Sequence, residues 1–304
     1  MTTTVLQPGE IEAAATDIPE LRLPPADVFL TRARRLDRLA DGHAMAGYLH
    51  FAARLAEAQH AALEAGPGGE PPSPERLAQC REYGMPPLAA AGLARPEGWH
   101  ETARQLARAV QSSLTQAGRE ALRPLLEGEG AWLDAQATHL LENDTAQAHA
   151  AAAPIVGAAL QVHWTHLARR LGPGQVARPE HPNLCPVCGS HPVSSIVRIG
   201  GAENGLRYLH CTLCSSEWHV VRAKCSNCDN SRDIACYHLE GGNRVVEAES
   251  CPECRTYLKL VHQDKDPGAD PVADDLASLT LDLLMDEAGV ARSGVNWYLV
   301  HGHP

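Results

Sequence analysis

The segment AKCSNCDN (223–230) contains two cysteines separated by two residues, and the same spacing recurs three times elsewhere in the chain. The four pairs are Cys185/Cys188, Cys211/Cys214, Cys225/Cys228 and Cys251/Cys254. The first and second pairs are separated by 22 residues, as are the third and fourth. Each cysteine of the first two pairs therefore has a counterpart 40 residues later in the last two pairs. The chain therefore contains an internal duplication of the motif C-x2-C-x22-C-x2-C.

This spacing suits metal binding. A C-x-x-C turn places two sulfur atoms on one side of a tight loop, where backbone N–H groups stabilise the thiolates. Two such turns on facing hairpins form a tetrahedral set of four thiolates that suits zinc or a single iron ion. A lone pair would be weak evidence, and disulfides or redox dithiols are the other uses of the motif. Four pairs in two matching halves predict two metal sites.

The 40-residue repeat favours sequential sites, each built from two consecutive pairs, although a crossed pairing of the motifs stays open. Four protein ligands close a site, so we expect no metal-activated water. Small ribbons of this kind have little core, and metal binding should therefore contribute to their folding.

The overall charge and the N-terminal sequence exclude several classes of protein. The net charge of -11 argues against a general nucleic-acid binder, which usually carries clustered Lys and Arg. The N-terminal sequence does not resemble a signal peptide, and no run of 18 apolar residues occurs. We expect a cytoplasmic protein without membrane insertion, in which cysteines stay reduced. The sequence leaves the oligomeric state open.

Residues 1–28 read as a polar, proline-containing arm, and residues 29–176 as a helical domain. Apolar periodicity predicts helices over 41–64, 99–114, 118–126 and 131–142. Pro154 suits the first turn of another helix, whose apolar face runs to Leu171. The segment LGPGQVARPEHPN (171–183) is a plausible boundary between the helical domain and the cysteine-rich part of the chain, because the cysteine-rich composition begins after it.

Short β-like runs follow at 194–198, 206–210 and 218–221. We assign 184–222 to a first four-cysteine module, 223–264 to a second, and 265–304 to a terminal helix and tail. The apolar face of that helix is expected to contain Leu276, Leu279, Leu283 and Ala288. The predicted fold class is α+β, with an N-terminal helical bundle followed by two tandem ribbon-like metal modules and a C-terminal helix.

Other reactive side chains have simpler interpretations. Cys80 and Cys236 lack a partner at matching spacing and are expected to be ordinary thiols. Structural roles are also favoured for four histidines: His163, His166, His210 and His219.

Acidic residues near the C-terminus suggest paired carboxylates, but they fit better as the polar face and N-terminal charge of the last helix. They are Asp274, Asp275, Asp282 and Asp286. No G-x-S-x-G, P-loop or G-x-G-x-x-G motif occurs. No catalytic constellation is found, and we expect a protein that is not an enzyme.

Four stretches resemble the FdhE family of formate dehydrogenase accessory proteins: LCPVCGSHPV (184–193), GLRYLHCTLCSSEWHVVRAKCSNC (205–228), ESCPEC (249–254) and KDPGADPVADDLASLTLDLLMDEAG (265–289). The resemblance implies a cytoplasmic protein needed for formate dehydrogenase activity. It implies action on the catalytic subunit during maturation, before export by the twin-arginine route. It also implies rubredoxin-like motifs with iron as the metal and the eight paired cysteines as ligands.

Three functions follow from these observations. We favour an assembly chaperone that binds the immature catalytic subunit, with exposed loop residues as contacts: Arg207, Tyr208, Trp218 and His219. The alternative is a rubredoxin-like electron carrier acting on the dehydrogenase, because an iron ion bound by four thiolates can change its oxidation state. The third, a zinc-ribbon nucleic-acid binder, is disfavoured by the charge.

Overall fold

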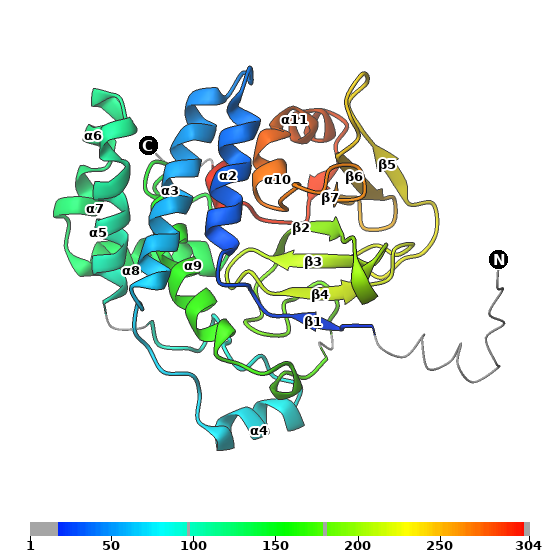
Figure 1. Cartoon of the computed structure of the whole chain (residues 1–304), viewed down its shortest axis with the longest axis horizontal. Helices are drawn as coiled ribbons and strands as arrows, with labels where there is room; N and C mark the ends of the chain where they lie inside the picture. The colour runs from blue at the N-terminus through cyan, green and yellow to red at the C-terminus, as the bar shows by residue number, and fades with distance from the viewer. Residues whose placement is uncertain (1–17, 96–97, 179–180, 301–304) are drawn as a thin grey trace, which may run out of the picture.

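A computed structural model of the chain describes residues 18–95, 98–178 and 181–300 (Figure 1). The first half is helical, and the second half contributes most of an eight-stranded sheet, so the mixed helix-and-sheet class is confirmed. The helices of the first half are α2 Val28–Ala40, α3 Ala46–Glu64, α4 Pro74–Glu82, α5 Trp99–Val110, α6 Gln116–Ala121, α7 Arg123–Glu127, α8 Gly130–Leu141 and α9 Ala153–Arg169. None of the helices in these ranges is long and apolar enough to cross a membrane.

Most of the helices predicted for the first half are present with adjusted ends, but the one expected over 118–126 is divided into α6 and α7 at Leu122. The helix expected over 41–64 begins at Ala46, and the one expected over 99–114 ends at Val110. Helix α4 was not predicted, because it lies between two Pro- and Gly-containing stretches. Ser73 caps it by accepting a hydrogen bond from the Arg76 N–H (3.3 Å), and Pro74 occupies its first turn.

Helix α9 lies at the centre of the helical half, and 15 of its 17 residues are buried. A helix that is apolar on nearly all sides must be surrounded by other elements. It packs against α3, α5, α8 and a short 3-10 turn at Trp297–Leu299. Gly157 permits the last of these contacts, since a Cβ atom there would lie 2.6 Å from the Trp297 ring.

The strands are β1 Leu21–Arg22, β2 Pro192–Val197, β3 Arg207–Cys211, β4 Glu217–Val220, β5 Ala235–Tyr237, β6 Val246–Cys251, β7 Thr256–His262 and β8 Ala291–Arg292. Their order is β1-β4-β3-β2-β7-β6-β5, and β8 pairs with β7. The first repeat supplies β4-β3-β2 and the second supplies β7-β6-β5. A parallel pairing of β2 with β7 joins the two repeats, so both predicted modules belong to one continuous sheet.

The end of the predicted N-terminal arm belongs to this sheet as well. Strand β1 pairs antiparallel with β4 through Leu21 and Arg22. Residues 1–17 of the arm lie outside the described residues.

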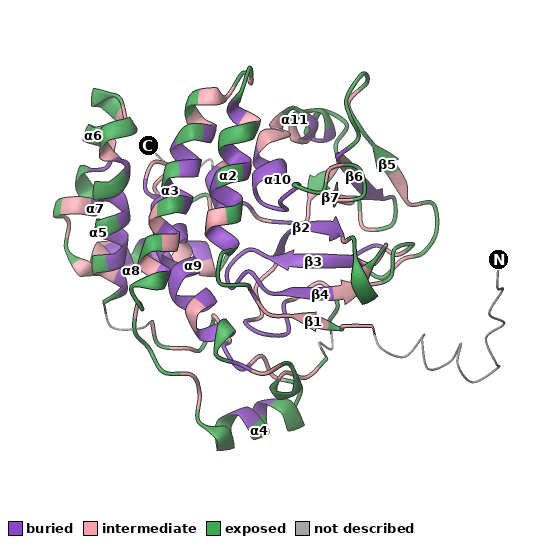
Figure 2. Cartoon of the chain, viewed as in Figure 1, coloured by how far each residue is buried: buried purple, intermediate pink, exposed green. Residues whose placement is uncertain are grey.

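One hydrophobic core connects the helical half to the first repeat. It contains Leu49 of α3, Leu106 of α5 and Leu160 of α9 together with Leu209 of β3 and Trp218 of β4. Figure 2 shows this buried layer running from α9 into β2, β3 and β4. The helices therefore pack on the first repeat rather than forming an independent bundle.

The C-terminal segment differs from the single amphipathic helix that we predicted. It forms α10 Ala273–Ala277 and α11 Leu279–Glu287, which are separated at Ser278. Leu276 is buried as expected, whereas Leu283 is 57% exposed.

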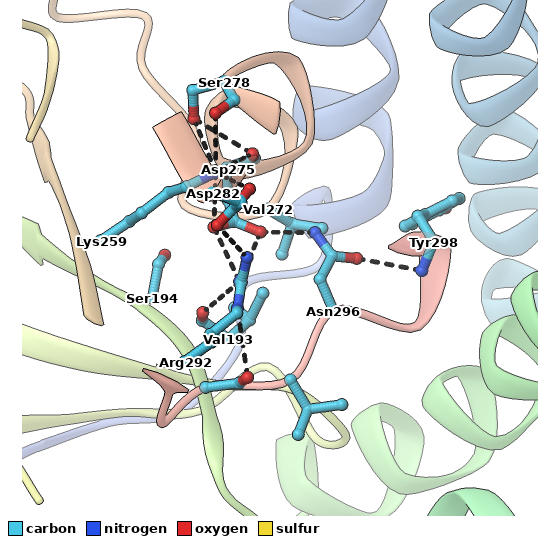
Figure 3. A network of polar contacts seen from close by, with 12 residues as sticks. Val193, Ser194, Lys259, Val272, Asp275, Ser278, Asp282, Arg292, Asn296 and Tyr298 are labelled. Carbon is cyan, nitrogen blue, oxygen red and sulfur yellow. Dashed lines mark hydrogen bonds and ion pairs between the residues drawn. The ribbon is translucent and has the colours of Figure 1, made fainter. Parts of the chain in front are cut away.

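Asp274 and Asp275 lie in the first turn of α10, as expected of acidic residues at a helix N-terminus, but both are buried, so the prediction that they form a polar helix face is wrong. Asp275 accepts two hydrogen bonds from the Arg292 guanidinium (2.8 Å each), and its Oδ1 lies 3.5 Å from the Lys259 Nζ (Figure 3). Asp282 pairs with both cations. One lysine and one arginine thus balance two carboxylates between β7, β8 and the terminal helices.

Candidate metal centres

The eight paired cysteines form two groups of four. In the first, the sulfur atoms of Cys185, Cys188, Cys211 and Cys214 all lie within 4.8 Å of one another, and the second brings together Cys225, Cys228, Cys251 and Cys254 in the same way. The motifs pair sequentially. All ten cysteines lie in the described ranges and have free thiols.

Each C-x-x-C motif forms the same tight loop. In three of them the N–H of the first cysteine donates to a carbonyl oxygen five residues later, at Ser190, Ser216 and Asn230 (2.7–2.9 Å). The residue after the second cysteine has a positive φ in all four: 75° at Gly189, 57° at Ser215, 61° at Asp229 and 54° at Arg255. This left-handed residue reverses the chain, so that both sulfur atoms of the motif face the same side.

Backbone N–H groups point at the sulfur atoms, as the motif predicts. The N–H groups of Leu213 and Cys214 both lie 3.4 Å from the Cys211 Sγ, and the Asn227 N–H lies 3.4 Å from the Cys225 Sγ. Burial alone would raise the pKa of Cys254, but hydrogen bonds from Thr256 and Asn227 outweigh burial and lower that pKa to about 6. These donors favour the thiolate form that binds metal.

The spacing of the sulfur atoms fits a tetrahedral ion. The separations are 3.6 Å for Cys185–Cys214 and 3.4 Å for Cys188–Cys211 in the first group. Both Cys225–Cys254 and Cys228–Cys251 are separated by 3.7 Å in the second. Four sulfur ligands about 2.3 Å from a central ion would lie about 3.8 Å apart. Each group could therefore hold one metal ion.

The helical half covers the first centre. The N–H groups of Leu88 and Ala90, in the loop after α4, donate to the carbonyl oxygens of Val187 and Cys188 (2.9 Å each). Gln161 of α9 donates to the carbonyl oxygen of Thr212 (2.8 Å). All four cysteines of this centre are buried.

The second centre is open to solvent. Cys228 is exposed and Cys254 is half-buried, whereas their counterparts Cys188 and Cys214 are buried. The Asn230 side chain donates to the Cys251 sulfur (3.5 Å) and is itself only half-buried. The two centres thus share one loop geometry but differ in accessibility.

The remaining thiols and the histidines lie apart from both groups. Cys80 is buried and Cys236 is exposed, and neither belongs to a group of four. The His210 ring lies 2.9 Å from the Glu217 carboxylate, and the His163 ring lies 3.1 Å from the Thr102 hydroxyl. These contacts support the structural roles that we expected for both histidines.

The expected contact residues are not exposed loop residues. Arg207 and Tyr208 lie in β3 and Trp218 lies in β4, and all three are buried. Arg207 pairs with Glu249 (2.7 Å), while the Tyr208 hydroxyl donates to the carbonyl oxygen of Pro19 (2.9 Å). Residues 19–22 cover this side of the first repeat, which could not be anticipated from the local sequence.

His219 was the fourth expected contact. It is half-buried, and its N–H donates to the carbonyl oxygen of Glu20 (3.0 Å). The sequence analysis also missed the cover of the first centre, because the Leu88 loop and Gln161 carry no recognisable motif.

Sequence models of three FdhE domains match the chain: "FdhE, N-terminal" over residues 18–180, "FdhE, central domain" over 184–222 and "FdhE, C-terminal domain" over 223–299. A "Protein FdhE homolog" from Pseudomonas aeruginosa is 43% identical over 99% of both chains. Another from Edwardsiella ictaluri is 45% identical over 90% of this chain and 89% of the relative. The crystal structure of the FdhE protein from Pseudomonas aeruginosa covers 93% of this chain and 100% of its own, with 42% identity and a TM-score of 0.83.

Proposed function

The chain belongs to the FdhE family, and from this we propose that it is an accessory protein for the maturation and activity of formate dehydrogenase. It acts as an assembly chaperone that binds the catalytic subunit of the enzyme in the cytoplasm. The identity of the client, the formate dehydrogenase catalytic subunit, is inferred from the family. The proposed metal binding is inferred from the two four-cysteine groups.

The closed set of four thiols at each centre carries the proposal. A catalytic metal keeps an open coordination position, whereas a structural metal has four protein ligands. With four cysteines around each ion, no position is left for a substrate or a reactive water. The chain is accordingly a binding protein and not an enzyme.

The proposed ligands are the eight grouped cysteines, and the proposed cofactors are two metal ions. Iron is favoured because the family resemblance implies rubredoxin-like sites, and zinc accepts the same four thiolates. In either case the ion would hold two loops together in each repeat. It would thereby fix the shape of the surface that the sheet presents.

Capture of the client tests this function. Tagged wild type, Cys185→Ser and Cys225→Ser are compared for capture of the purified catalytic subunit, with Cys80→Ser as a control outside both groups. Metal content and circular dichroism are measured on each bait. We expect capture by wild type and the control, with loss of capture and of one metal in at least one ligand variant.

Other results would change the assignment. Capture by all four baits would keep the client but remove the metal centres from the binding surface. If wild type does not capture the subunit, the proposed function is wrong.

The exposed Cys228 favours one alternative. A rubredoxin-like iron site that passes electrons to the dehydrogenase needs an edge that a partner can approach, and the second centre has one. A coloured protein with a reversible iron couple would support this alternative, and colourless zinc protein would exclude it.

A further inference from the structure

Strand β5 forms one end of the sheet. It pairs with β6 through Ala235, Cys236 and Tyr237, and no strand within the described ranges pairs with its other side. Cys236 is exposed, and Tyr237 is 51% exposed. Figure 1 shows β5 at the rim of the molecule, beyond β6. An uncovered edge strand presents unpaired backbone groups and can accept a further strand.

The internal duplication shows which strand of the first repeat is equivalent to β5. The 40-residue offset relates β3 to β6, so that Leu209 corresponds to Glu249. Ser195 of β2 lies opposite Leu209, and Cys236 of β5 lies opposite Glu249. One step along, Ile196 lies opposite Tyr208, as Tyr237 lies opposite Ala248. Cys236 and Tyr237 thus occupy the places of Ser195 and Ile196.

In the first repeat this edge is covered. Strand β7 runs parallel to β2, with Leu260 beside Ser195 and Val261 beside Ile196. The Gln263 N–H donates to the Val197 carbonyl oxygen (3.1 Å). Ser195 and Ile196 are both fully buried as a result. The fold thus contains one example of the pairing that the β5 edge lacks.

The opposite end of the sheet is not available in the same way. Strand β1 pairs with the outer edge of β4 through Leu21 and Arg22. Leu21 and Arg22 are both half-buried. Cys236 and Tyr237 of β5 are exposed. Of the two ends of the sheet, β5 is therefore the more accessible to a different chain.

We propose that the β5 edge is the docking site for an extended segment of the client subunit, which adds as a parallel strand beside Cys236 and Tyr237. This inference rests on the proposed function, since it names the surface that the client uses. Backbone hydrogen bonds would supply the affinity, as in other cases of strand addition. Leu260 and Val261 fill the corresponding positions beside β2, so the segment should be apolar and β-forming.

The backbone direction in β2 suggests a specific variant. Arg198 exchanges backbone hydrogen bonds with the β3 side, through Leu206 and Gly205 (2.9 Å each). Alternate residues of a strand point their N–H groups to opposite sides, so Ser195 faces β7. By the correspondence above, the Cys236 N–H faces the open edge. Proline at 236 removes that donor without removing a bond to β6.

The test compares Cys236→Pro with Cys236→Ala, which lacks the same thiol but keeps the N–H. Binding of the purified catalytic subunit to full-length protein is measured by biolayer interferometry, and hydrogen exchange of the complex is followed by mass spectrometry. Both variants must match wild type in metal content and thermal unfolding. If proline perturbs the fold, the exchange data on wild type decide the outcome.

We expect proline to weaken binding by roughly tenfold or more while alanine binds as wild type. Amide exchange over residues 232–239 should slow by about tenfold in the complex. Equal binding by all three proteins, or protection only elsewhere, would overturn strand docking while leaving the client assignment intact. Absence of wild-type binding would overturn both. A dimer of this chain that protects the same amides without the client would make a second copy the occupant and also overturn the proposal.

Discussion

The side chain of Gln161, in the central helix α9, donates a hydrogen bond of 2.8 Å to the carbonyl oxygen of Thr212, which lies inside the second C-x-x-C loop. Gln161 in turn accepts a hydrogen bond from Gln59 of α3 (2.9 Å). Two helices are thereby connected to the loop that presents Cys211 and Cys214. The first four-cysteine centre is therefore part of the core and not an appendage to it.

Gln161→Met should destabilise the protein by about 1–3 kcal/mol, because the buried Thr212 carbonyl and the Gln59 amide would lose a partner. The free energy of unfolding in urea measures this. Gln116→Met, on the exposed side of α6, is the control and should change it by less than about 0.5 kcal/mol. Equal effects of the two substitutions would contradict the role of Gln161.

The two centres should release metal at different rates. Cys228 is exposed and its counterpart Cys188 is buried, so a chelator reaches the second centre first. We expect one metal equivalent to leave at least about tenfold faster than the other. The Cys228→Ser variant should lack the fast phase, and Cys188→Ser should lack the slow one. Two equal rates in wild type would argue against this difference.

Lys259 is fully buried between two carboxylates, Asp275 and Asp282. Removing one member of a buried ion network leaves uncompensated charge, so Lys259→Met should cost about 3–5 kcal/mol of unfolding free energy. The matched control is Lys265→Met, whose partly exposed pair with Glu247 should contribute at most about 1 kcal/mol. Chemical unfolding measures the unfolding free energy of both variants. Similar losses of unfolding free energy in the two would contradict the importance of the buried network.

Acid should destabilise the protein through Glu217. Burial acts to raise the pKa of this carboxyl, but Arg198 and His210 outweigh burial and hold the pKa well below its usual range. A carboxyl with a lowered pKa in the folded state stabilises the protein above its unfolded pKa of about 4.3. That stability is lost as the pH falls through the lower, folded-state pKa.

The corresponding measurement is the free energy of unfolding between pH 7 and pH 3. Wild type should lose stability below about pH 4, with a slope of up to about 1.4 kcal/mol per pH unit from this group. Glu217→Gln should be less stable at pH 7 and show a shallower decline. Glu57→Gln, at an exposed position of α3, should follow the wild-type curve.

Gly189 has a φ of 75° directly after the first C-x-x-C pair, and a Cβ atom there would only touch Pro86 at 3.6 Å. The cost of Gly189→Ala should therefore come from the left-handed backbone, at about 1–2 kcal/mol. Gly174→Ala, where φ is not positive and space is open, should have little effect. Thermal unfolding compares the two, and a neutral Gly189→Ala would show that this loop adapts.

The features that depend on local sequence were well predicted. The C-x-x-C spacing, the 40-residue repeat and the strands near 194–198, 206–210 and 218–221 all appear in the structure. Each depends on residues close together in the chain. The two-residue spacing of a C-x-x-C motif limits the distance between its two sulfur atoms, whatever the position of the loop in the fold.

Burial was less well predicted, because it depends on which distant segment covers a side chain. Tyr208 has an aromatic side chain that suits a contact surface, but residues near Pro19 cover it. Asp275 resembles a solvent-facing helix charge, but Arg292 and Asn296 approach it from the C-terminal segment. Neither partner can be identified from the local sequence.

The sequence by itself therefore determined the four C-x-x-C pairs and their 40-residue repeat, since ligand spacing and loop geometry are local properties. It favoured sequential grouping of the pairs, which the structure then showed. Only the tertiary structure decided that the first centre is sealed beneath α9 while the second stays open, and that β2 is paired while β5 is not. The two repeats carry the same motif, so their difference comes from their neighbours. Long-range packing cannot be read from the periodicity of the sequence, and it places the two similar repeats in different environments.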